Sequence, residues 1–244
     1  MTYLVYDLDG TLVTSSKEIT DDMINVLSDL QKNGYKNVLV TGGEYKKVLF
    51  QLRNRIDLFD MIFTECGAVL NQKGIQIYKK DIVSTIDTKL LENIYDKFLD
   101  MCDKINYTEK TEKYTGNRVD KRNGLVYLTP VGMEANNELR SDFIQYENET
   151  NFRDKLIPKL KELDIHNQVE IVKGGKTGVS VYPTGIDKTQ ILKYIPKSTI
   201  YFFGDNCQIG GNDYPLFIHS RCKGFEINNY KHCINLLTNL FTKR

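Results

Sequence analysis

The sequence contains no tryptophan and no long hydrophobic run. Tryptophan stacks well on flat apolar surfaces, so its absence disfavours some kinds of carbohydrate site without excluding the others. No apolar stretch approaches the roughly 20 residues that span a bilayer. The N-terminus, MTYLVYDLDG, lacks the pattern of a signal peptide. We therefore expect no membrane partner.

The five cysteines form no C-x-x-C pair, which disfavours a zinc framework. Their odd number and wide spacing also fit a disulfide scaffold poorly. We expect reduced thiols and a cytoplasmic location, because reducing compartments keep thiols unpaired.

No charge of one sign dominates, since 33 basic and 32 acidic residues leave a formal net charge of +1. A chain without a global basic field has no general attraction for nucleic acid, so we expect no nucleic-acid partner. Binding of an anionic substrate must come from local placement of charge. The length of 244 residues allows one large domain or two modest ones.

Both ends of the chain alternate between strand and helix patterns. Short buried strands are predicted at 3–6, 38–40, 61–63 and 199–203 from their β-prone apolar runs. Helices are predicted from a Thr20 cap to Gly34, from near Glu44, and over about 229–241. This alternation predicts a parallel sheet covered by helices.

The middle of the chain has a different character. Helical spacing of apolar residues appears over 90–101 and over roughly 150–163, where Pro158 is expected to introduce a kink. Short β-like runs lie at 125–128, 169–172 and 179–182. The simplest organisation is an α/β core made of residues 1–83 and 186–244, with an α+β module inserted at 84–185.

Two acidic motifs follow predicted strands. The first is Asp7-Leu8-Asp9-Gly10-Thr11, in which one carboxylate can attack phosphorus and the other can protonate a leaving oxygen. The second is Gly204-Asp205 followed by Gly210-Gly211-Asn212-Asp213. The carboxyl ends of parallel strands share one sheet edge, so Asp205 can complete a Mg²⁺ site begun by Asp7, with Asp213 behind it. A plain D-x-D-G turn explains the first motif equally well, but not both motifs together.

Two weaker signals lie nearby. Thr41-Gly42-Gly43 follows a predicted strand and can seat a phosphate through a hydroxyl and backbone N–H groups, although a simple strand-to-helix turn looks the same. Lys188 stands at a predicted helix start and can neutralise a transferring phosphoryl group. A solvated surface lysine is the alternative for that position.

Taken in this order, these motifs resemble those of the haloacid dehalogenase (HAD) superfamily of phosphotransferases. Further segments resemble its eukaryotic-type phosphomannomutase branch over nearly the whole chain. The segments that carry this resemblance are Val40-Thr41-Gly42-Gly43, Arg122-Asn123-Gly124, Thr129-Pro130-Val131-Gly132, Gly174-Gly175, Val181-Tyr182-Pro183-Thr184-Gly185-Ile186-Asp187-Lys188, and Tyr201-Phe202-Phe203-Gly204-Asp205 with Gly210-Gly211-Asn212-Asp213. The resemblance implies a Rossmann-like HAD core with a parallel sheet, and an inserted α+β cap domain that sets substrate specificity.

The resemblance also implies roles for individual residues. Asp7 is expected as the nucleophile and Asp9 as the general acid and base. Mg²⁺ is expected on the Asp7 side chain, the Asp9 backbone carbonyl and Asp205. The transferring phosphate is expected on the Thr41-Gly42-Gly43 loop and Lys188. Arg122 and Arg140 fall on cap positions that bind the phosphate that is not reacting, and a surface arginine is the alternative for each.

The chain departs from the family pattern where the substrate is bound. Met133 replaces an expected arginine after the Pro-x-Gly segment, and Ser16 replaces another, with Lys17 as a substitute. Gly178 and Ser180 stand where the family has a serine and an aspartate that hold sugar hydroxyls. Lys176 adds a positive charge. We expect Lys176 and Ser180 to contact substrate and the core chemistry to be intact.

The expected activity is phosphoryl transfer on hexose phosphates through an aspartyl-phosphate, as in conversion of mannose 6-phosphate to mannose 1-phosphate. The resemblance implies a hexose 1,6-bisphosphate activator and a homodimer formed through the cap. A HAD-type sugar phosphate phosphatase remains an alternative, because losing one arginine contact weakens retention of a bisphosphate by about 10- to 100-fold. An inactive sugar-phosphate binding module is disfavoured, since Asp7, Asp9, Lys188 and Asp205 are all present.

Overall fold

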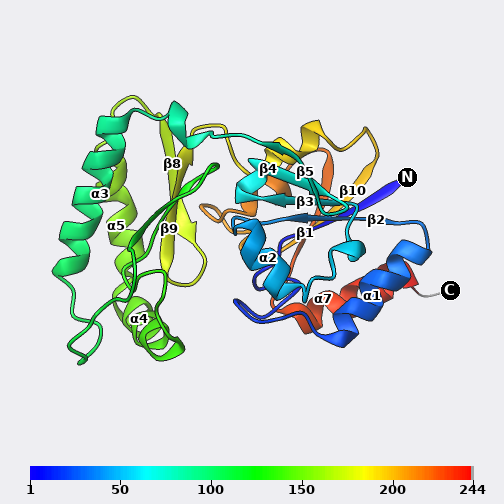
Figure 1. The fold of residues 1–244 in the computed structure, drawn as a ribbon, viewed down its shortest axis with the longest axis horizontal. Coiled ribbons are helices and arrows are strands. Elements are labelled where there is room, and N and C mark those ends of the chain that lie inside the picture. Colours follow the sequence, from blue (N-terminus) through cyan, green and yellow to red (C-terminus); the bar gives the residue numbers. More distant parts are fainter. Residues whose placement is uncertain (243–244) are drawn as a thin grey trace. The chain divides into compact units, whose positions relative to one another are not determined.

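The computed structural model describes residues 1–242. The chain divides into two compact units. The first joins Met1–Lys80 to the chain from Ile186 onward, and the second is Asp81–Gly185. Figure 1 labels the main elements of both units.

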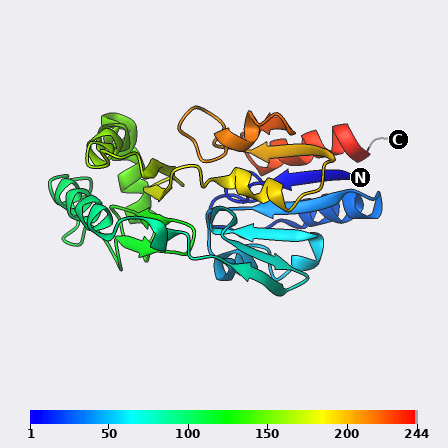
Figure 2. The same cartoon turned by 90° about the horizontal axis from the view of Figure 1, so that it is seen from above.

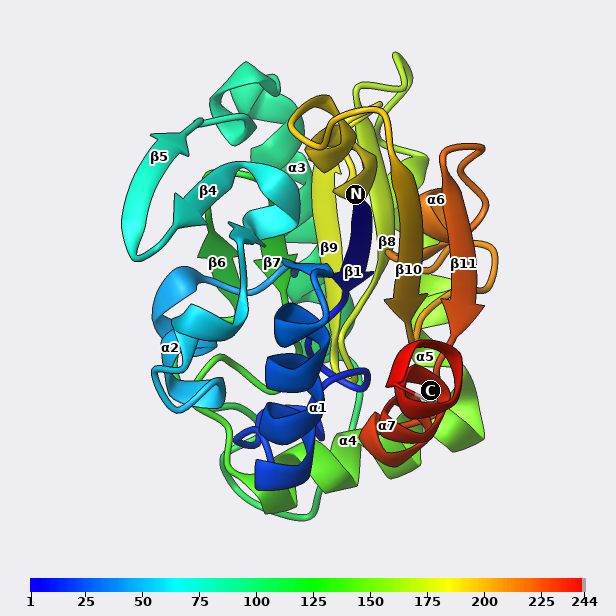
Figure 3. The same ribbon diagram turned by 90° about the vertical axis from the view of Figure 1, so that its right-hand side faces the viewer.

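The first unit is built on a seven-stranded sheet in the order β11-β10-β1-β2-β3-β4-β5. Figures 2 and 3 show β1 lying beside β10. Five strands run parallel, and these are β1 (Thr2–Tyr6), β2 (Lys36–Val40), β3 (Met61–Thr64), β10 (Thr199–Gly204) and β11 (Cys222–Glu226). The hairpin of β4 (Val69–Gln72) and β5 (Ile75–Lys79) adds two antiparallel strands at one edge.

Helices cover both faces of this sheet, because alternate residues of its strands are apolar on each side. One face packs against α1 (Asp21–Lys32), α2 (Tyr45–Gln51) and α7 (Tyr230–Leu237), and Figure 3 shows α1 and α7 near each other. The other face packs against the 3-10 helix η4 (Lys188–Lys193) and α6 (Tyr214–Phe217). Helix α1 starts where predicted, since the Thr20 hydroxyl accepts a hydrogen bond from the Met23 N–H. A π-helical turn, η5 (Thr238–Thr242), follows α7.

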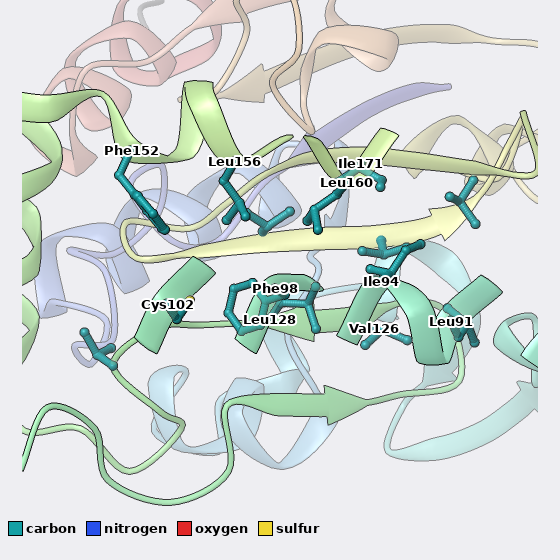
Figure 4. Packing of buried hydrophobic residues seen from close by; sticks show 14 of the residues in the cluster. Leu91, Ile94, Phe98, Cys102, Val126, Leu128, Phe152, Leu156, Leu160 and Ile171 are labelled. Carbon is teal, nitrogen blue, oxygen red and sulfur yellow. The ribbon is translucent and has the colours of Figure 1, made fainter. Parts of the chain in front are cut away.

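The second unit is a four-stranded antiparallel sheet with helices on one face. Its order is β6 (Val119–Lys121), β7 (Val126–Leu128), β9 (Gly178–Pro183) and β8 (Val169–Gly174). Figure 4 shows the packing against α3 (Thr88–Asp103) and α5 (Phe152–Lys161), where Phe98 and Leu156 meet Leu128 and Ile171. Helix α4 (Asn137–Thr150) completes this core. Tyr127 and Ser180, paired between β7 and β9, alternate with these core residues and belong to the opposite face.

The expected fold class is confirmed, namely an α/β core with a parallel sheet and an inserted α+β unit. The inserted unit begins at Asp81 rather than at residue 84, because the backbone N–H groups of Ile82 and Val83 both donate to the Asn123 carbonyl. The predicted helix over 150–163 is shorter. Asn151 adopts a left-handed conformation with φ of 51° and separates α5 from α4, which was not predicted.

In residues 1–242 we find no helix that is both long and apolar enough to cross a membrane.

Candidate active site

Asp7 stands at the carboxyl end of the central strand of the parallel sheet. Its backbone N–H donates to the Phe203 carbonyl at 2.9 Å, which continues the pairing of β1 with β10. Its side chain is buried, and Lys188 Nζ lies 2.6 Å from Asp7 Oδ1. Lys188 is fully buried, so the predicted surface alternative does not apply to it. The same Nζ lies 2.6 Å from Asp213 Oδ1, so one ammonium bridges two buried carboxylates.

Three carboxylates gather at this edge of the sheet. Ligand oxygens of Asp7, Asp205 and Asp213 all lie within 4.8 Å of one another. Gly10 makes the approach of Asp205 to the first acidic loop feasible. It has φ of 93°, and a Cβ at this position would lie 2.0 Å from Asp205 Oδ2. Gly10 therefore allows the acidic loops of two distant parts of the chain to meet.

Burial and mutual repulsion shift the protonation of this cluster. Burial raises the pKa of Asp7 well above its usual range, although the charge of Lys188 opposes the shift. Burial lowers the pKa of Lys188, but the carboxylates of Asp213 and Asp7 outweigh it and the net change is upward. Part of the Asp205 side chain is open to solvent. The protein around it still removes part of its hydration, and this desolvation together with the negative charge of Asp213 raises the pKa of Asp205 to about 7.

The cluster fits a small divalent cation. Three carboxylates and one ammonium leave an excess of negative charge among oxygen ligands, which is the donor chemistry that Mg²⁺ prefers. Asp7 and Asp205 would hold the ion, and Asp213 would support it. The Asp9 side chain does not belong to this group of oxygens, so a contribution from Asp9 would have to come from its backbone carbonyl.

We expect Mg²⁺ binding to strengthen with rising pH. A carboxylate must lose its proton to bind a metal, and the pKa of Asp205 is raised to about 7. The apparent Kd should fall by up to about tenfold per pH unit below neutrality and level off above it. Calorimetric titration in buffers of different ionisation enthalpy measures both the affinity and the protons released. A Kd that is constant across this range contradicts the assignment, and Asp205→Asn should leave only the pH dependence that Asp7, whose pKa is also raised, contributes.

Asp9 has an environment of its own, built from three hydrogen-bond donors. Lys47 Nζ lies 2.7 Å from Asp9 Oδ2. The Ser16 backbone N–H and Gln51 Nε2 lie 2.7 Å and 2.8 Å from Asp9 Oδ1. Burial alone would raise the pKa of Asp9, but the charge and hydrogen bond of Lys47 together with the other donors lower it below its usual value. Asp9 is thus held as a carboxylate in this structure.

The Thr41-Gly42-Gly43 loop follows β2, the neighbour of β1 on the side away from β10. Thr41 is buried, and its hydroxyl accepts a hydrogen bond from the Gly43 N–H at 3.1 Å. The loop is braced by the segment after β3, because Cys66 N–H donates to the Thr41 carbonyl and Glu65 N–H donates to the Gly43 carbonyl. The predicted phosphate seat is therefore an ordered loop at the same sheet edge as Asp7.

In the second unit, Arg122 is oriented by two neighbours. Its Nε donates to Asp120 Oδ2 at 2.7 Å, and its guanidinium carbon lies 5.2 Å from the centre of the Tyr127 ring. The Arg122 side chain is only 10% exposed, so it is not an ordinary surface arginine. The ion pair with Asp120 and the cation–π contact with Tyr127 restrict the Arg122 side chain before any ligand binds. Arg122 therefore loses less rotamer freedom on binding than an unrestrained arginine would.

Tyr127 also explains the glycine at position 178. Tyr127 donates a hydrogen bond from its hydroxyl to the Gly174 carbonyl at 3.1 Å. A Cβ on Gly178 would lie 2.3 Å from the ring carbon Cζ of Tyr127, so a serine cannot stand there with the ring in place. Ser180 is buried beside this ring, whereas Lys176 is exposed in the turn between β8 and β9. The structure places Ser180 and Arg122 next to Tyr127 but gives Lys176 no such neighbour.

Arg140 lies beside Met133. Its Nε donates to the Ala135 carbonyl at 3.0 Å and its Nη2 donates to the Met133 carbonyl at 3.3 Å. These contacts give Arg140 a structural part in the loop that precedes α4. An arginine at position 133 would therefore add a second positive charge to the loop that Arg140 contacts.

Sequence reasoning missed Lys47, Gln51 and Tyr127. Lys47 and Gln51 are four residues apart on α2, so they lie on one face of the helix, and this spacing was the available signal. No local signal connected them with Asp9, which is about 40 residues earlier in the chain. In the sequence, Tyr127 is one residue of an alternating strand pattern. Its effect on position 178 appears only in the structure, where its ring fills the space that a Cβ on Gly178 would need.

Comparison with known proteins places these features in a family. The sequence profile described as eukaryotic phosphomannomutase matches residues 23–243. The chain is 31% identical to a phosphomannomutase of Babesia bovis, over 98% of both chains. It is 32% identical to a probable phosphomannomutase of Caenorhabditis elegans, over 98% of this chain and 96% of that one.

Solved structures agree on the fold. An IMP-bound IMP-nucleotidase of Plasmodium falciparum matches with a TM-score of 0.62 at 16% identity, over 98% of this chain and 68% of that one. A sugar phosphatase of HAD subclass IIB matches with a TM-score of 0.51 at 19% identity, over 96% of this chain and 91% of that one. At these identities the likeness concerns the HAD fold alone.

Proposed function

The chain belongs to the eukaryotic phosphomannomutase family, and from this premise we propose that it interconverts mannose 6-phosphate and mannose 1-phosphate. The fold and the family make it a phosphotransferase. The observation that carries the proposal is the buried cluster in which Lys188 bridges Asp7 and Asp213 beside Asp205, at the end of parallel strands. A cluster so costly to bury suits a site that stabilises charge on a transferring group.

In the first half-reaction, Asp7 acts as the nucleophile. A bond forms between an Asp7 carboxylate oxygen and phosphorus while the bond from phosphorus to the sugar oxygen breaks. The sugar oxygen takes a proton that Asp9, a carboxylate in this structure, has received from a sugar hydroxyl in the other half-reaction. Lys188, 2.6 Å from Asp7 Oδ1, offsets the charge of the phosphoryl group during the transfer.

In the second half-reaction, the free hydroxyl of a bound hexose monophosphate attacks the phosphorus on Asp7, so that a hexose 1,6-bisphosphate forms. That hydroxyl gives its proton to Asp9, the bond between Asp7 and phosphorus breaks, and both aspartates return to their starting states. Bound Mg²⁺ would supply positive charge that keeps Asp7 ionised despite its burial and neutralises the phosphate oxygens.

A mutase must also retain a second phosphate while the bisphosphate turns round. We assign the retention of the second phosphate to two arginines of the inserted unit. These are Arg122, which is held by Asp120 and Tyr127, and Arg140. Ser180 and Lys176 remain candidates for contacts to the sugar and its phosphate. Hexose 1,6-bisphosphate would then be both the intermediate and the activator that first phosphorylates Asp7.

A sugar phosphate phosphatase is the second candidate, and Met133 favours it. This position would carry an arginine in the family pattern, and each charged contact to a phosphate contributes about 1.5–3 kcal/mol. A bisphosphate held by fewer contacts leaves sooner, which exposes phospho-Asp7 to water. Both activities use the same nucleophile, so their ratio separates the two candidates.

Met133→Arg should raise the ratio of isomerisation to phosphate release. The new guanidinium would stand beside Arg140, whose Nη2 contacts the Met133 carbonyl, and would add a contact to the second phosphate. We expect a rise of about 10-fold in retention of the bisphosphate. Met133→Leu is the matched control, since it keeps the volume and adds no charge. An unchanged ratio in Met133→Arg would mean that this loop does not hold the second phosphate.

The proposed function is tested by a panel of hexose 1- and 6-phosphates with Mg²⁺ and a hexose 1,6-bisphosphate. Isomerisation and inorganic phosphate are measured in the same reactions. The proposal expects the two mannose phosphates to interconvert faster than either releases phosphate. Release of phosphate without isomerisation would establish the phosphatase, and absence of both reactions would establish a binding module.

Two further expectations remain as proposals. The family suggests a homodimer formed through the inserted unit, which sedimentation equilibrium would test. The five cysteines are free thiols, which suits a reducing compartment such as the cytoplasm.

A further inference from the structure

We propose that Lys47 and Gln51 are positioning residues that fix the Asp9 carboxylate for proton transfer, an inference that rests on the acid–base role proposed for Asp9. Both side chains come from one face of α2 and reach a residue in the loop after β1. Helix α2 directly follows the Thr41-Gly42-Gly43 loop. One short segment would therefore supply the phosphate seat and orient the proton donor.

The contacts to Asp9 form a closed set around its two oxygens. Oδ2 accepts from Lys47 Nζ at 2.7 Å, and Oδ1 accepts from Gln51 Nε2 at 2.8 Å and from the Ser16 N–H at 2.7 Å. Donors on both oxygens fix the plane of the carboxylate as well as its position. An acid–base group needs this control, because proton transfer requires a hydrogen-bond distance to one particular sugar oxygen.

Gln51 shows that this arrangement has a cost. The side chain is fully buried, and its Oε1 has no hydrogen-bond partner among residues 1–242. Its Nε2 faces two acceptors, Asp9 Oδ1 and the Lys17 carbonyl, so exchanging the amide atoms would not satisfy the group. An apolar residue would fill the same space without an unsatisfied oxygen. A glutamine kept there at the expense of stability points to its donor contact with Asp9.

Two simpler explanations of Lys47 must be separated from this one. Lys47 is 42% exposed, and an ordinary surface ion pair has little effect on anything. Its chain also passes Gly43, with Cδ at 3.8 Å from where a Cβ on that glycine would be, so it could instead bind the transferring phosphate. The first explanation predicts no effect of substitution, and the second predicts an equal effect on every phosphate ester.

The dependence of the rate on the leaving group distinguishes the three explanations of Lys47, namely a positioning residue, an ordinary surface ion pair and a phosphate ligand. Breaking the bond from phosphorus to the oxygen of mannose 1-phosphate requires a proton for the departing oxygen. 2,4-Dinitrophenol departs as a stable anion and needs none. We therefore compare the first turnover of mannose 1-phosphate with the first-turnover release of dinitrophenol from 2,4-dinitrophenyl phosphate, so that later attack by water does not contribute.

Lys47→Met should lower the first turnover of mannose 1-phosphate by about 10- to 100-fold, part of the 10²–10⁴-fold that acid–base catalysis supplies. Release of dinitrophenol should stay within about threefold, because that step does not use Asp9 as an acid. Lys47→Arg should restore most of the loss, since it keeps the charge and a donor. Lys46→Met is the matched control: the neighbouring lysine is exposed and has no ion pair among residues 1–242, so both rates should stay near the parent.

Gln51→Met gives an independent test. It should show the same selective loss on mannose 1-phosphate, while the midpoint of thermal unfolding stays equal or rises because the unsatisfied Oε1 is gone. A merely structural glutamine would instead lower the midpoint and slow both substrates together.

The outcomes separate this inference from the proposed function. Asp9→Asn is the reference, and it should slow mannose 1-phosphate far more than the dinitrophenyl ester. If Asp9→Asn shows that selectivity and Lys47→Met does not, the positioning role is wrong and the proposed function stands. An equal loss of rate on both substrates in Lys47→Met would identify Lys47 as a phosphate ligand. A faster first turnover of mannose 1-phosphate in that variant would mean that Lys47 hinders proton transfer by Asp9, and the positioning role would again be wrong. If Asp9→Asn shows no selectivity, the acid–base role itself fails.

Discussion

Asp7→Asn should reduce turnover of mannose phosphates by at least about 10⁴-fold, the scale on which removal of a nucleophile acts in enzymes that form covalent intermediates. The amide keeps the shape of the side chain but cannot form an acyl phosphate. No other described carboxylate shares its position, since Asp205 follows the neighbouring parallel strand β10 and Asp213 lies in the loop after it. Steady-state assays with Mg²⁺ and a bisphosphate activator measure the loss.

The stability of Asp7→Asn is the control for this result. Burial raises the pKa of Asp7, and the nearby charges of Asp213 and Asp205 add to the shift, so the ionised form is costly in the folded state. Replacing it with a neutral amide should therefore leave the midpoint of thermal unfolding equal or higher, as is common where a site is built for function rather than stability. Activity within tenfold of the parent in a correctly folded variant would exclude Asp7 as the nucleophile.

Lys188→Met should lower both activity and stability. Lys188 is fully buried and its Nζ lies 2.6 Å from carboxylate oxygens of both Asp7 and Asp213. Removing one partner of a buried charge network leaves the others uncompensated, which costs about 3–5 kcal/mol at neutral pH. Turnover should fall by about 10²–10³-fold, because the positive charge beside the phosphoryl group is lost.

The pH dependence of this variant follows from the same contacts. Without the ammonium, the buried Asp7 holds its proton to higher pH in the folded state than in the unfolded chain. The folded state then binds more protons, so the free energy of unfolding of Lys188→Met should decrease as pH rises from about 4 toward neutrality. Added Mg²⁺ should restore part of the lost free energy of unfolding, because it supplies positive charge beside the carboxylates.

Denaturant unfolding at several pH values measures this trend. Lys193→Met, in the same helical element but exposed, should change stability by less than about 0.5 kcal/mol. Equal stability of Lys188→Met and Lys193→Met at neutral pH would mean that Lys188 does not balance the buried carboxylates.

The central residues of the site could be predicted because their signals are local. Buried strands that end directly in Asp7 and Asp205 identify one sheet edge from sequence alone, since parallel strands present their carboxyl ends together. The Thr20 cap and the apolar spacing after it likewise determine α1 without reference to the rest of the chain.

Other features depend on contacts that no local pattern encodes. Helix α4 was missed because only one narrow stripe of its residues, including Leu139 and Phe143, is apolar and buried. The β5 strand was missed although Ile75 and Ile77 alternate with Gln76, because this alternation is short and, as the exposure of both isoleucines shows, does not mark a buried face. Two of the three donors to Asp9, Lys47 and Gln51, come from a helix about 40 residues away, and only the folded chain brings them to Asp9.

The most direct test of the account is to trap the phosphorylated protein. The parent chain is mixed with Mg²⁺ and mannose 1,6-bisphosphate, quenched in acid, digested, and analysed by mass spectrometry for a phosphoryl group on the N-terminal peptide. The account predicts one phosphoryl group on Asp7, absent in Asp7→Asn and discharged when mannose 1-phosphate is added before the quench. A phosphoryl group on a different residue, or interconversion of mannose phosphates with no phosphorylated protein at any time, would contradict it.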